Sequence, residues 1–129
     1  MRITVQQAAD RILSQDRILI LSHKSPDGDT LGSAYALLYA LYACGKRARV
    51  MCSDPVPPQF AYLAEGESET AFEPLFIIAV DVASKELLGS ALAEYASRVN
   101  LCIDHHRTNG DYACGTLVDD QAAAACEIL

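Results

Sequence analysis

The sequence predicts an α/β fold in which helices cover both faces of a parallel β-sheet. Short runs of apolar residues alternate with segments of helical periodicity, and this order is typical of right-handed βαβ units. The clearest runs cover residues 18–21, 75–80 and 99–103, and they are almost uniformly apolar, as expected of parallel strands that are buried on both faces. A chain of 129 residues suffices for one compact domain and not for two. We therefore expect one Rossmann-like, three-layer domain over residues 1–129.

The first third of the chain is predicted to form a helix, a strand and a second helix. Thr4 and Gln7 fit a capping box, so a helix is expected to follow Thr4. Its apolar residues repeat at helical spacing and predict one buried stripe made of Val5, Ala8, Ala9, Ile12 and Leu13. Residues 18–21 are the first strand, and residues 30–44 are a strongly apolar helix. Gly45 ends that helix as its C′ residue.

The rest of the chain repeats this alternation with shorter pieces. Prolines concentrated in residues 55–58 remove backbone donors and predict a loop. Residues 65–69 are expected to be a solvated acidic loop, and residues 108–111 have the composition of a turn. The remaining elements are expected to be a strand at 49–52, a short helix at 59–64, a strand at 75–80, a helix at 85–97, strands at 99–103 and 116–118, and a helix from residue 121 capped by Asp120.

Composition and charge narrow the class of protein. Hydrophobic residues make up 51% of the chain and charged residues 21%, which is typical of a soluble globular protein. No apolar run approaches the roughly 20 residues that cross a bilayer, and residues 1–7 lack the features of a secretory signal. We therefore expect a cytoplasmic protein with no membrane partner. The net charge of −7 disfavours a broad basic surface for duplex nucleic acid, but a small phosphorylated substrate is compatible with it, because divalent cations would reverse the local charge.

The cysteines do not form a recognisable framework. They are odd in number, and none of them forms a CxxC pair, which argues against both a disulfide scaffold and a structural zinc site. Free cysteine is commonly buried, so the following residues are expected to be small members of the core: Cys44, Cys52, Cys102, Cys114 and Cys126.

Histidines and carboxylates gather where predicted strands end. The only histidines of the chain are His23, after the first strand, and the pair His105 and His106, after the strand at 99–103. The acidic residues at the same strand ends are Asp27, Asp29, Asp81 and Asp104. In an open α/β sheet, ligands bind outside the carboxyl ends of the strands, so these side chains are expected to meet at one place.

A set of this kind suits a pair of divalent cations. Several carboxylates held together repel one another unless cations neutralise them. Imidazole mixed with carboxylate favours manganese, iron or zinc over calcium. Asp81 lies between the two groups of candidate ligands and could bridge two metals. Two metals about 3.5–4 Å apart can clamp a phosphate and activate water at neutral pH.

Other interpretations share part of this pattern. Asp29 alone could be a helix N-cap, and His23 alone could be a loop residue bonded to the backbone. Asp27-Gly28-Asp29 also resembles the nucleophile motif of haloacid-dehalogenase phosphatases, but there the nucleophile directly follows the strand and the chemistry has no use for the histidine pair. A nucleotide-binding or regulatory module without turnover remains open, although the visible candidate ligands are all intact.

Three motifs, in order, resemble those of the DHH phosphoesterase superfamily. Residues 22–33, with the sequence Ser-His-Lys-Ser-Pro-Asp-Gly-Asp-Thr-Leu-Gly-Ser, resemble the first motif, Val80-Asp81 the second, and Asp104-His105-His106 the third. The contexts Asp81-Val82-Ala83-Ser84 and Arg107-Thr108-Asn109 are most similar to the bifunctional oligoribonuclease and 3′-phosphoadenosine 5′-phosphate phosphatase (nanoRNase) subfamily. The resemblance implies a DHH catalytic domain that hydrolyses phosphate esters with water activated by two metals.

The resemblance also implies a role for each candidate residue. One Mn²⁺ would be held by His23, Asp27 and Asp81, and the other by Asp29, Asp81 and His105, with Asp81 bridging; Mg²⁺, Co²⁺ or Fe²⁺ are alternatives. His106 would stabilise the substrate phosphate, and Asp104 would orient a histidine rather than bind metal. Asp81, Asp104 and His106 are therefore the candidate catalytic residues.

The chain departs from the family pattern in two ways. A fourth-motif aspartate, expected well after the third motif, is absent, and so is the carboxyl-terminal DHHA1 domain that binds substrate. The final predicted helix is short and has no stop signal, so we expect a truncated catalytic domain that is weakly active or inactive alone. The expected substrates are short single-stranded oligoribonucleotides or 3′-phosphoadenosine 5′-phosphate; the alternative is an activity like that of family II pyrophosphatases or exopolyphosphatases. The oligomeric state is left open.

Overall fold

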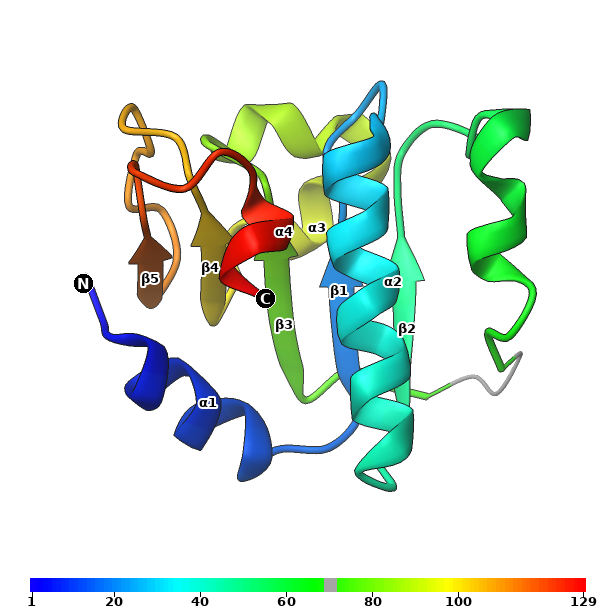
Figure 1. The fold of residues 1–129 in the computed structure, drawn as a ribbon, viewed down its shortest axis with the longest axis horizontal. Coiled ribbons are helices and arrows are strands. Elements are labelled where there is room, and N and C mark those ends of the chain that lie inside the picture. The colour runs from blue at the N-terminus through cyan, green and yellow to red at the C-terminus, as the bar shows by residue number, and fades with distance from the viewer. Residues whose placement is uncertain (69–71) are drawn as a thin grey trace.

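The computed structural model describes residues 1–68 and 72–129, and it contains a five-stranded parallel sheet with the order β2-β1-β3-β4-β5 (Figure 1). The strands are β1 (Ile18–Leu21), β2 (Ala48–Met51), β3 (Phe76–Val80), β4 (Leu101–Asp104) and β5 (Gly115–Val118). Every residue of β1, β3 and β4 is buried, as the apolar runs predicted. The predicted α/β fold with a parallel sheet is confirmed.

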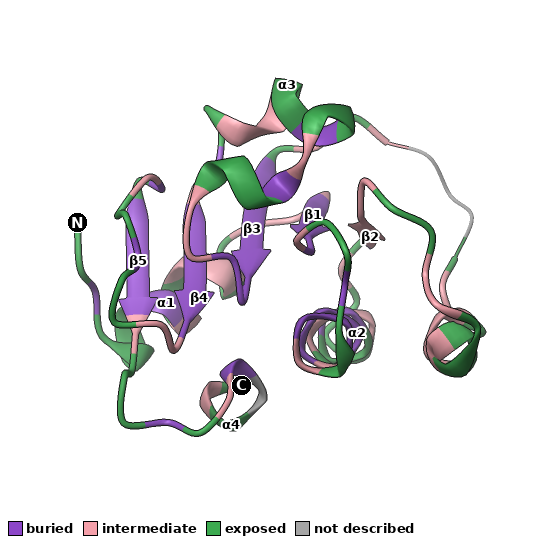
Figure 2. Ribbon diagram, turned by 90° about the horizontal axis from the view of Figure 1, so that it is seen from above, coloured by how far each residue is buried: buried purple, intermediate pink, exposed green. Residues whose placement is uncertain are grey.

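Helical segments cover both faces of this sheet, so the fold has three layers (Figure 2). One face packs against α2 (Gly28–Ala43), with α1 (Val5–Leu13) and α4 (Ala125–Ile128) beside it and a 3₁₀ helix at Pro58–Ala64. The other face packs against α3 (Ala93–Ala96) and two 3₁₀ turns, Lys85–Leu88 and Ser90–Leu92. Side chains of β1 alternate between the two cores, with Ile18 and Ile20 in one and Leu19 and Leu21 in the other.

The capping box at the start of α1 is confirmed. The backbone N–H of Gln7 donates to Thr4 Oγ1 at 3.1 Å, and the N–H of Thr4 donates to Gln7 Oε1 at 2.9 Å. The predicted buried stripe is only partly present, because Val5 and Leu13 are 61% and 59% exposed. The short helix lies across the lower end of the sheet, so only the middle of its apolar face, at Ala8, is fully covered.

Both outer edges of the sheet are covered. At β5, the N–H of Ile3 donates to the carbonyl of Thr116 at 2.9 Å, and the N–H of Thr116 donates to the carbonyl of Met1 at 2.8 Å. At β2, the N–H of Val50 donates to the carboxylate of Glu67 at 2.7 Å. Glu67 belongs to the predicted acidic loop, whose last residue, Glu69, lies outside the described residues.

The helix predicted over residues 85–97 is wrong. Three short pieces replace it, because Gly89 adopts φ +86° between Lys85–Leu88 and Ser90–Leu92. A Cβ at Gly89 would lie 2.6 Å from Ser53 Oγ. The hydroxyl of Ser53 also donates to the carbonyl of Leu88 at 2.6 Å, so the break joins this segment to the loop after β2.

The last helix and the cysteines also differ from expectation. The helix α4 begins at Ala125, after Ala124, and Asp120 does not cap it; its carboxylate accepts instead from Arg107 at 3.1 Å. Cys102 is buried and Cys52 is half-buried, but Cys44 and Cys114 are exposed, because they lie at the end of α2 and in the turn before β5. The side chain of Cys126 lies outside the described part of the structure.

The helices of the described residues are too short or too polar to span a membrane.

The break at Gly89 gives a test of the fold. Gly89→Ala is expected to lower the free energy of unfolding by about 1–3 kcal/mol, because residue 89 has φ +86°, which residues with a Cβ rarely adopt, and the new Cβ would meet Ser53. Gly110→Ala is the control, since its Cβ would find only the carbonyl of Ala83 at 3.8 Å, and it should change stability by less than about 0.5 kcal/mol. Urea denaturation measures both. Equal effects of the two substitutions would contradict the requirement for glycine at residue 89.

Candidate metal centre

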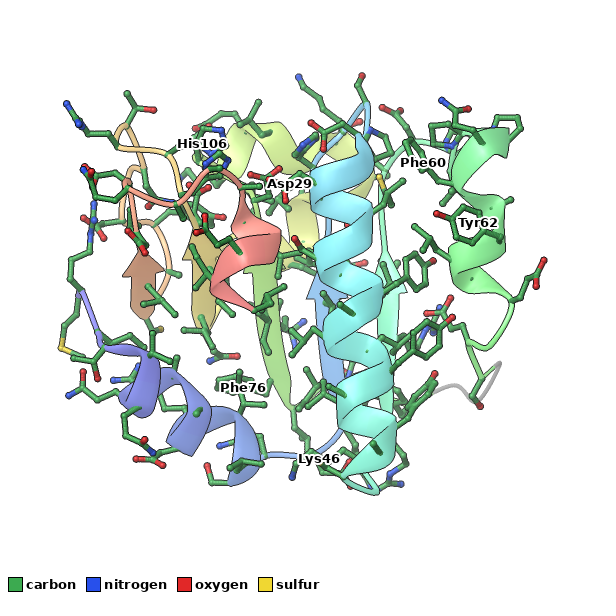
Figure 3. The ribbon with its side chains drawn as sticks, in the orientation of Figure 1. Asp29, Lys46, Phe60, Tyr62, Phe76 and His106 are labelled. Atoms are coloured by element: carbon green, nitrogen blue, oxygen red, sulfur yellow. The ribbon has the colours of Figure 1, made fainter. Side chains whose placement is uncertain are left out.

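The candidate ligands meet at the carboxyl edge of three adjacent strands. The order β1-β3-β4 places the segments after these strands side by side. Figure 3 shows Asp29, at the top of α2, and His106, beyond β4, at the same end of the sheet. All of the predicted site residues lie at this edge: His23, Asp27, Asp29, Asp81, Asp104, His105 and His106. The distances between their side chains define two groups of possible metal ligands.

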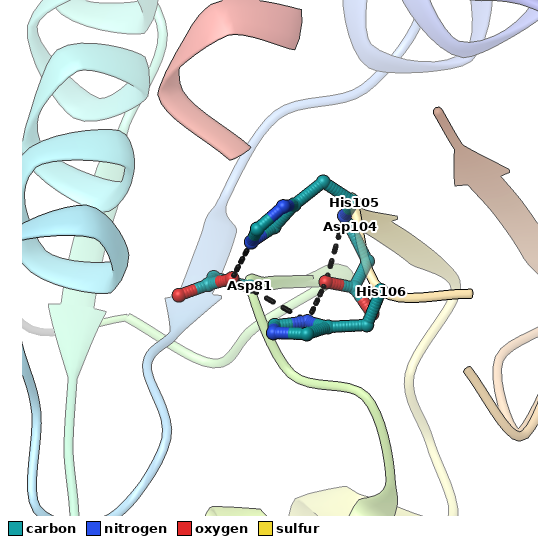
Figure 4. Close-up of side chains that lie close together, drawn as sticks. All are labelled: Asp81, Asp104, His105 and His106. Atoms are coloured by element: carbon teal, nitrogen blue, oxygen red, sulfur yellow. Dashed lines mark hydrogen bonds and ion pairs between the residues drawn. The ribbon is translucent and has the colours of Figure 1, made fainter. Parts of the chain in front are cut away.

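Asp81 belongs to both groups. It follows β3 directly, adopts φ +59°, and is 3% exposed. Its Oδ1 lies 3.3 Å from His105 Nε2 and 3.7 Å from His106 Nδ1 (Figure 4). Its Oδ2 lies 3.7 Å from His23 Nε2. Oδ1 is buried and has no hydrogen-bond partner among the described residues. Burial, followed by the charge of Asp29, raises the pKa of Asp81. A neighbouring positive charge would therefore stabilise the ionised form of this carboxylate.

The first group consists of His23, Asp27 and Asp81, whose possible ligand atoms lie within 4.8 Å of one another. His23 Nδ1 is 2.7 Å from the carbonyl of Lys24. A carbonyl only accepts, so Nδ1 carries the proton and Nε2 is the nitrogen that faces the carboxylates. Asp27 is the N-cap of α2, where its Oδ1 accepts from the N–H of Thr30 at 3.0 Å.

The second group consists of Asp81, Asp104, His105 and His106, again with possible ligand atoms within 4.8 Å of one another. Asp104 is fully buried, and donors already surround it. Its Oδ1 accepts from the backbone of His105 at 2.8 Å and contacts His106 Nδ1 at 2.6 Å (Figure 4). Its Oδ2 accepts from the amide of Asn109 at 2.8 Å. Both oxygens of Asp104 therefore have hydrogen-bond partners, and its role in orienting a histidine stays a prediction.

Asp29 completes the edge from the side of α2. Its Oδ2 lies 3.5 Å from His105 Nε2. The hydroxyl of Ser33 donates to its Oδ1 at 3.2 Å, and the backbone N–H of Ala125 donates to its Oδ2 at 2.9 Å. The interpretation of Asp29 as an N-cap is wrong, because α2 begins at Gly28 and Asp27 caps it.

Two contributors to the site were not identified from the sequence. The sequence predicts only a turn at Asn109, whereas the structure shows its buried amide donating to Asp104 and its Oδ1 accepting from the N–H of Asp111 at 2.8 Å. An asparagine five residues after a buried aspartate is a weak signal, because the same residue type favours turns. The N–H of Ala125 has no side-chain signature at all.

Open space adjoins the first group. A cavity of about 410 Å³ has the following lining: His23, Lys24, Ser25, Asp27, Asp81, Ala83, Leu87 and His106. In this cavity Lys24 and His106 lie next to the carboxylates of Asp27 and Asp81. A larger cavity of about 730 Å³ shares Lys24 as a wall. The edge of the sheet therefore has room for an anionic ligand beside the candidate metal ligands.

The donor set fits divalent metal. Carboxylates alone would suit calcium or magnesium, whereas imidazole nitrogens mixed with carboxylates suit first-row transition metals. Asp81 belongs to both groups, and its buried Oδ1 has no hydrogen-bond partner among the described residues, so a cation beside this carboxylate would offset its charge. The Asp and His groups at this edge could bind metal.

Comparison with known proteins identifies similar sequences. The model of the DHH family, N-terminal domain, matches residues 17–129. A "Probable bifunctional oligoribonuclease and PAP phosphatase NrnA" from Streptococcus mutans is 29% identical over 122 residues, which are 92% of this chain and 39% of that protein. The "Bifunctional oligoribonuclease and PAP phosphatase NrnA" of Thermus thermophilus is 30% identical over 120 residues, with 87% and 35% covered. The chain thus spans well under half the length of these curated relatives.

Solved structures share the fold. An exopolyphosphatase-related protein from Bacteroides fragilis superposes with a TM-score of 0.82 at 20% identity, over 96% of this chain and 41% of that chain. CDC45 from Entamoeba histolytica superposes with a TM-score of 0.52 at 16% identity, over 92% of this chain and 25% of that chain. At these identities the likeness concerns the fold alone.

The electrostatics of the first group can be tested without metal. The Asp81 carboxylate, with the Lys24 carbonyl and Asp27, raises the pKa of His23 to about 8. In chelator-treated protein, Asp81→Asn is expected to lower the pKa of His23 toward its ordinary value of 6.5, as measured by NMR titration of the imidazole. Because the folded pKa is the higher one, the charged imidazole stabilises the fold fully below pH 6.5, and this contribution disappears as the pH rises through about 8.

Asp29→Asn is the control for this titration, because Asp29 faces His105 and not His23. It should leave the pKa of His23 close to that of the unchanged protein. An unchanged pKa of His23 in Asp81→Asn would show that Asp81 is not its dominant partner.

Proposed function

This chain belongs to the DHH family, and we propose that its metal centre serves the hydrolysis of phosphate esters in short oligoribonucleotides or in 3′-phosphoadenosine 5′-phosphate. Members of this family are metal-dependent phosphoesterases. The substrates are proposed from the names of the curated relatives, which are oligoribonucleases and PAP phosphatases. Because the chain covers 35% to 41% of their lengths, we propose that residues 1–129 provide the metal-binding part of the enzyme and that most substrate contacts come from elsewhere.

The observation that supports this proposal is the buried oxygen of Asp81. It lies between two groups of possible ligands and lacks a hydrogen-bond partner among the described residues. We assign one Mn²⁺ to His23, Asp27 and Asp81, and a second to Asp29, Asp81 and His105. When bound, the two cations would polarise the phosphate and activate water at neutral pH. Mn²⁺ is preferred over Mg²⁺ because imidazole is among the ligands, and Co²⁺ or Fe²⁺ would fit the same donors.

The residues around the metals have positioning tasks. His23 is held by the carbonyl of Lys24, so its Nε2 faces Asp81. His106 is held at Nδ1 by Asp104, and its Nε2 is the nitrogen that would meet a phosphate oxygen. In its protonated form His106 would donate to that oxygen as negative charge develops there. Asp104 stays a hydrogen-bond acceptor, and Asn109 keeps it in place.

The adjoining cavities suit the proposed substrates. The cavity of about 410 Å³ is bounded by both His23 and His106, so a phosphate there would touch both candidate motifs. Lys24 separates it from the cavity of about 730 Å³, where the remainder of a nucleotide could extend. A lysine at this junction would attract a phosphorylated ligand despite the net charge of −7.

Release of phosphate tests the proposed activity. The complete protein is expected to release phosphate from 3′-phosphoadenosine 5′-phosphate when Mn²⁺ is present, and chelation should abolish release. His105→Ala should lower kcat by at least about 100-fold, because one proposed ligand is removed. Thr108→Ala, an exposed change in the same loop, is the control and should keep full activity.

Three outcomes of this assay would change the conclusion. Release of phosphate from pyrophosphate instead of the nucleotide would keep the metal centre and replace the substrate. Tight Mn²⁺ binding with no turnover of either compound would favour a nucleotide-binding module. Full activity of His105→Ala would remove this residue from the proposed centre.

Metal stoichiometry tests the bridging role of Asp81. The unchanged protein should bind two Mn²⁺ per chain in calorimetry, and Asp81→Ala should weaken both sites by about 10- to 100-fold or more, because it contributes to each. Asp104→Asn should keep both sites, since its carboxylate is occupied by hydrogen bonds, while turnover falls through His106. Two sites of normal affinity in Asp81→Ala would refute the bridge.

A further inference from the structure

We propose that residues 119–129, which we call the arch, position Asp29 for the second metal through the backbone N–H of Ala125. This inference rests on the metal centre proposed above and adds a part of the chain that carries none of its ligands. The donor and acceptor are 96 residues apart in sequence and 2.9 Å apart in space.

The first residue of the arch is hydrogen-bonded to Asp104 of the third motif. It follows β5, and the N–H of Asp119 donates to the carbonyl of Asp104 at 3.2 Å. Asp119 then stabilises the first turn, because its carboxylate and carbonyl accept from the N–H groups of Gln121 and Ala122 at 3.1 and 3.2 Å. In Figure 1 this segment, drawn in red, runs from the top of β5 past β4 and returns as α4 next to α2.

The arch ends on α2, where it is well anchored. Ala125 is fully buried and Ala122 is 8% exposed. Ile128 packs against the core on the α2 face of the sheet. The carboxylate of Glu127 accepts from the N–H of Ala123 at 2.7 Å and stabilises the turn that leads into α4. These contacts fix the N–H of Ala125 in space independently of Asp29.

The hydrogen bond acts on the oxygen that faces the second metal. Oδ2 of Asp29 accepts from Ala125 and also lies 3.5 Å from His105 Nε2. Oδ1 is held separately by the hydroxyl of Ser33 at 3.2 Å. A carboxylate with a donor at each oxygen is held in one orientation, and groups that orient metal ligands in this way affect metal affinity. A carboxylate oxygen accepts more than one partner, so the N–H does not prevent metal binding.

The arch therefore joins two of the three segments that supply the proposed second metal site. One end is bonded to Asp104, the last residue of β4 and the neighbour of His105, and the other to Asp29 on α2. Within the part of the chain that the structure describes, no hydrogen bond joins the arch to His23 or Asp27, the ligands proposed only for the first metal. Loss of the Ala125 donor should thus weaken one metal site and spare the other.

Ala125→Pro, made in the complete protein, removes this one donor. Ala125 is the first residue of α4 and follows Ala124 in an extended conformation (φ −157°, ψ 158°), which is a position and a preceding conformation that proline accepts. The expected result is a second Mn²⁺ bound about 10- to 100-fold more weakly, with the first unchanged, in calorimetry and Mn²⁺ electron paramagnetic resonance. Ala125→Gly is the matched control, because it keeps the N–H and disturbs the helix, and it should bind both ions normally.

Thermal unfolding separates positioning from general damage. The expected pattern is a Tm for Ala125→Gly at or below that of Ala125→Pro, with weaker metal binding in the proline variant alone. Equal, normal binding of two Mn²⁺ by Ala125→Pro overturns the inference, and so does equal weakening in both variants. If the proline variant does not fold, Ile128→Ala decides by loosening α4: a weaker second site supports the arch, and an unchanged one overturns it. Absence of Mn²⁺ binding by the unchanged protein would instead refute the proposed metal centre itself.

Discussion

One buried carboxylate imposes the main constraint on this structure. Asp81 directly follows the central strand in a left-handed backbone conformation, and one of its oxygens has no hydrogen-bond partner among the described residues. Both features cost free energy, so the surrounding packing must maintain them. The strands on either side, β1 and β4, end at the same edge and bring their histidines to this carboxylate. The order of the strands therefore determines which side chains lie next to the Asp81 carboxylate.

A second layer of hydrogen bonds orients the groups around Asp81. The Lys24 carbonyl fixes the ring of His23, and Asn109 fixes Asp104, which in turn fixes His106. These partners are backbone groups or buried polar side chains, and each has a defined acceptor or donor. Rigid orientation matters for metal sites, because a ligand that must reorganise binds more weakly.

The sequence predicted the strands well and placed the candidate ligands at the ends of those strands, because both depend on local patterns. Short apolar runs mark buried parallel strands, and the residues directly after them must lie at one edge of the sheet. The helix over residues 85–97 failed because composition does not reveal that Gly89 must adopt a positive φ beside Ser53. The extent of α4 and the contact between Ala125 and Asp29 depend on packing between segments far apart in sequence, as does the burial of Asn109.

The covered edges of the sheet bear on how the chain behaves among copies of itself. An open parallel sheet presents unpaired backbone groups at both sides, and another chain can add a strand there. Here Met1 and Ile3 are bonded to Thr116 of β5, and the Glu67 carboxylate takes the N–H of Val50 in β2. Met1 and Ile3 thus occupy backbone groups of β5 with which another strand could otherwise pair, and a fusion partner joined directly before Met1 would lie next to this edge.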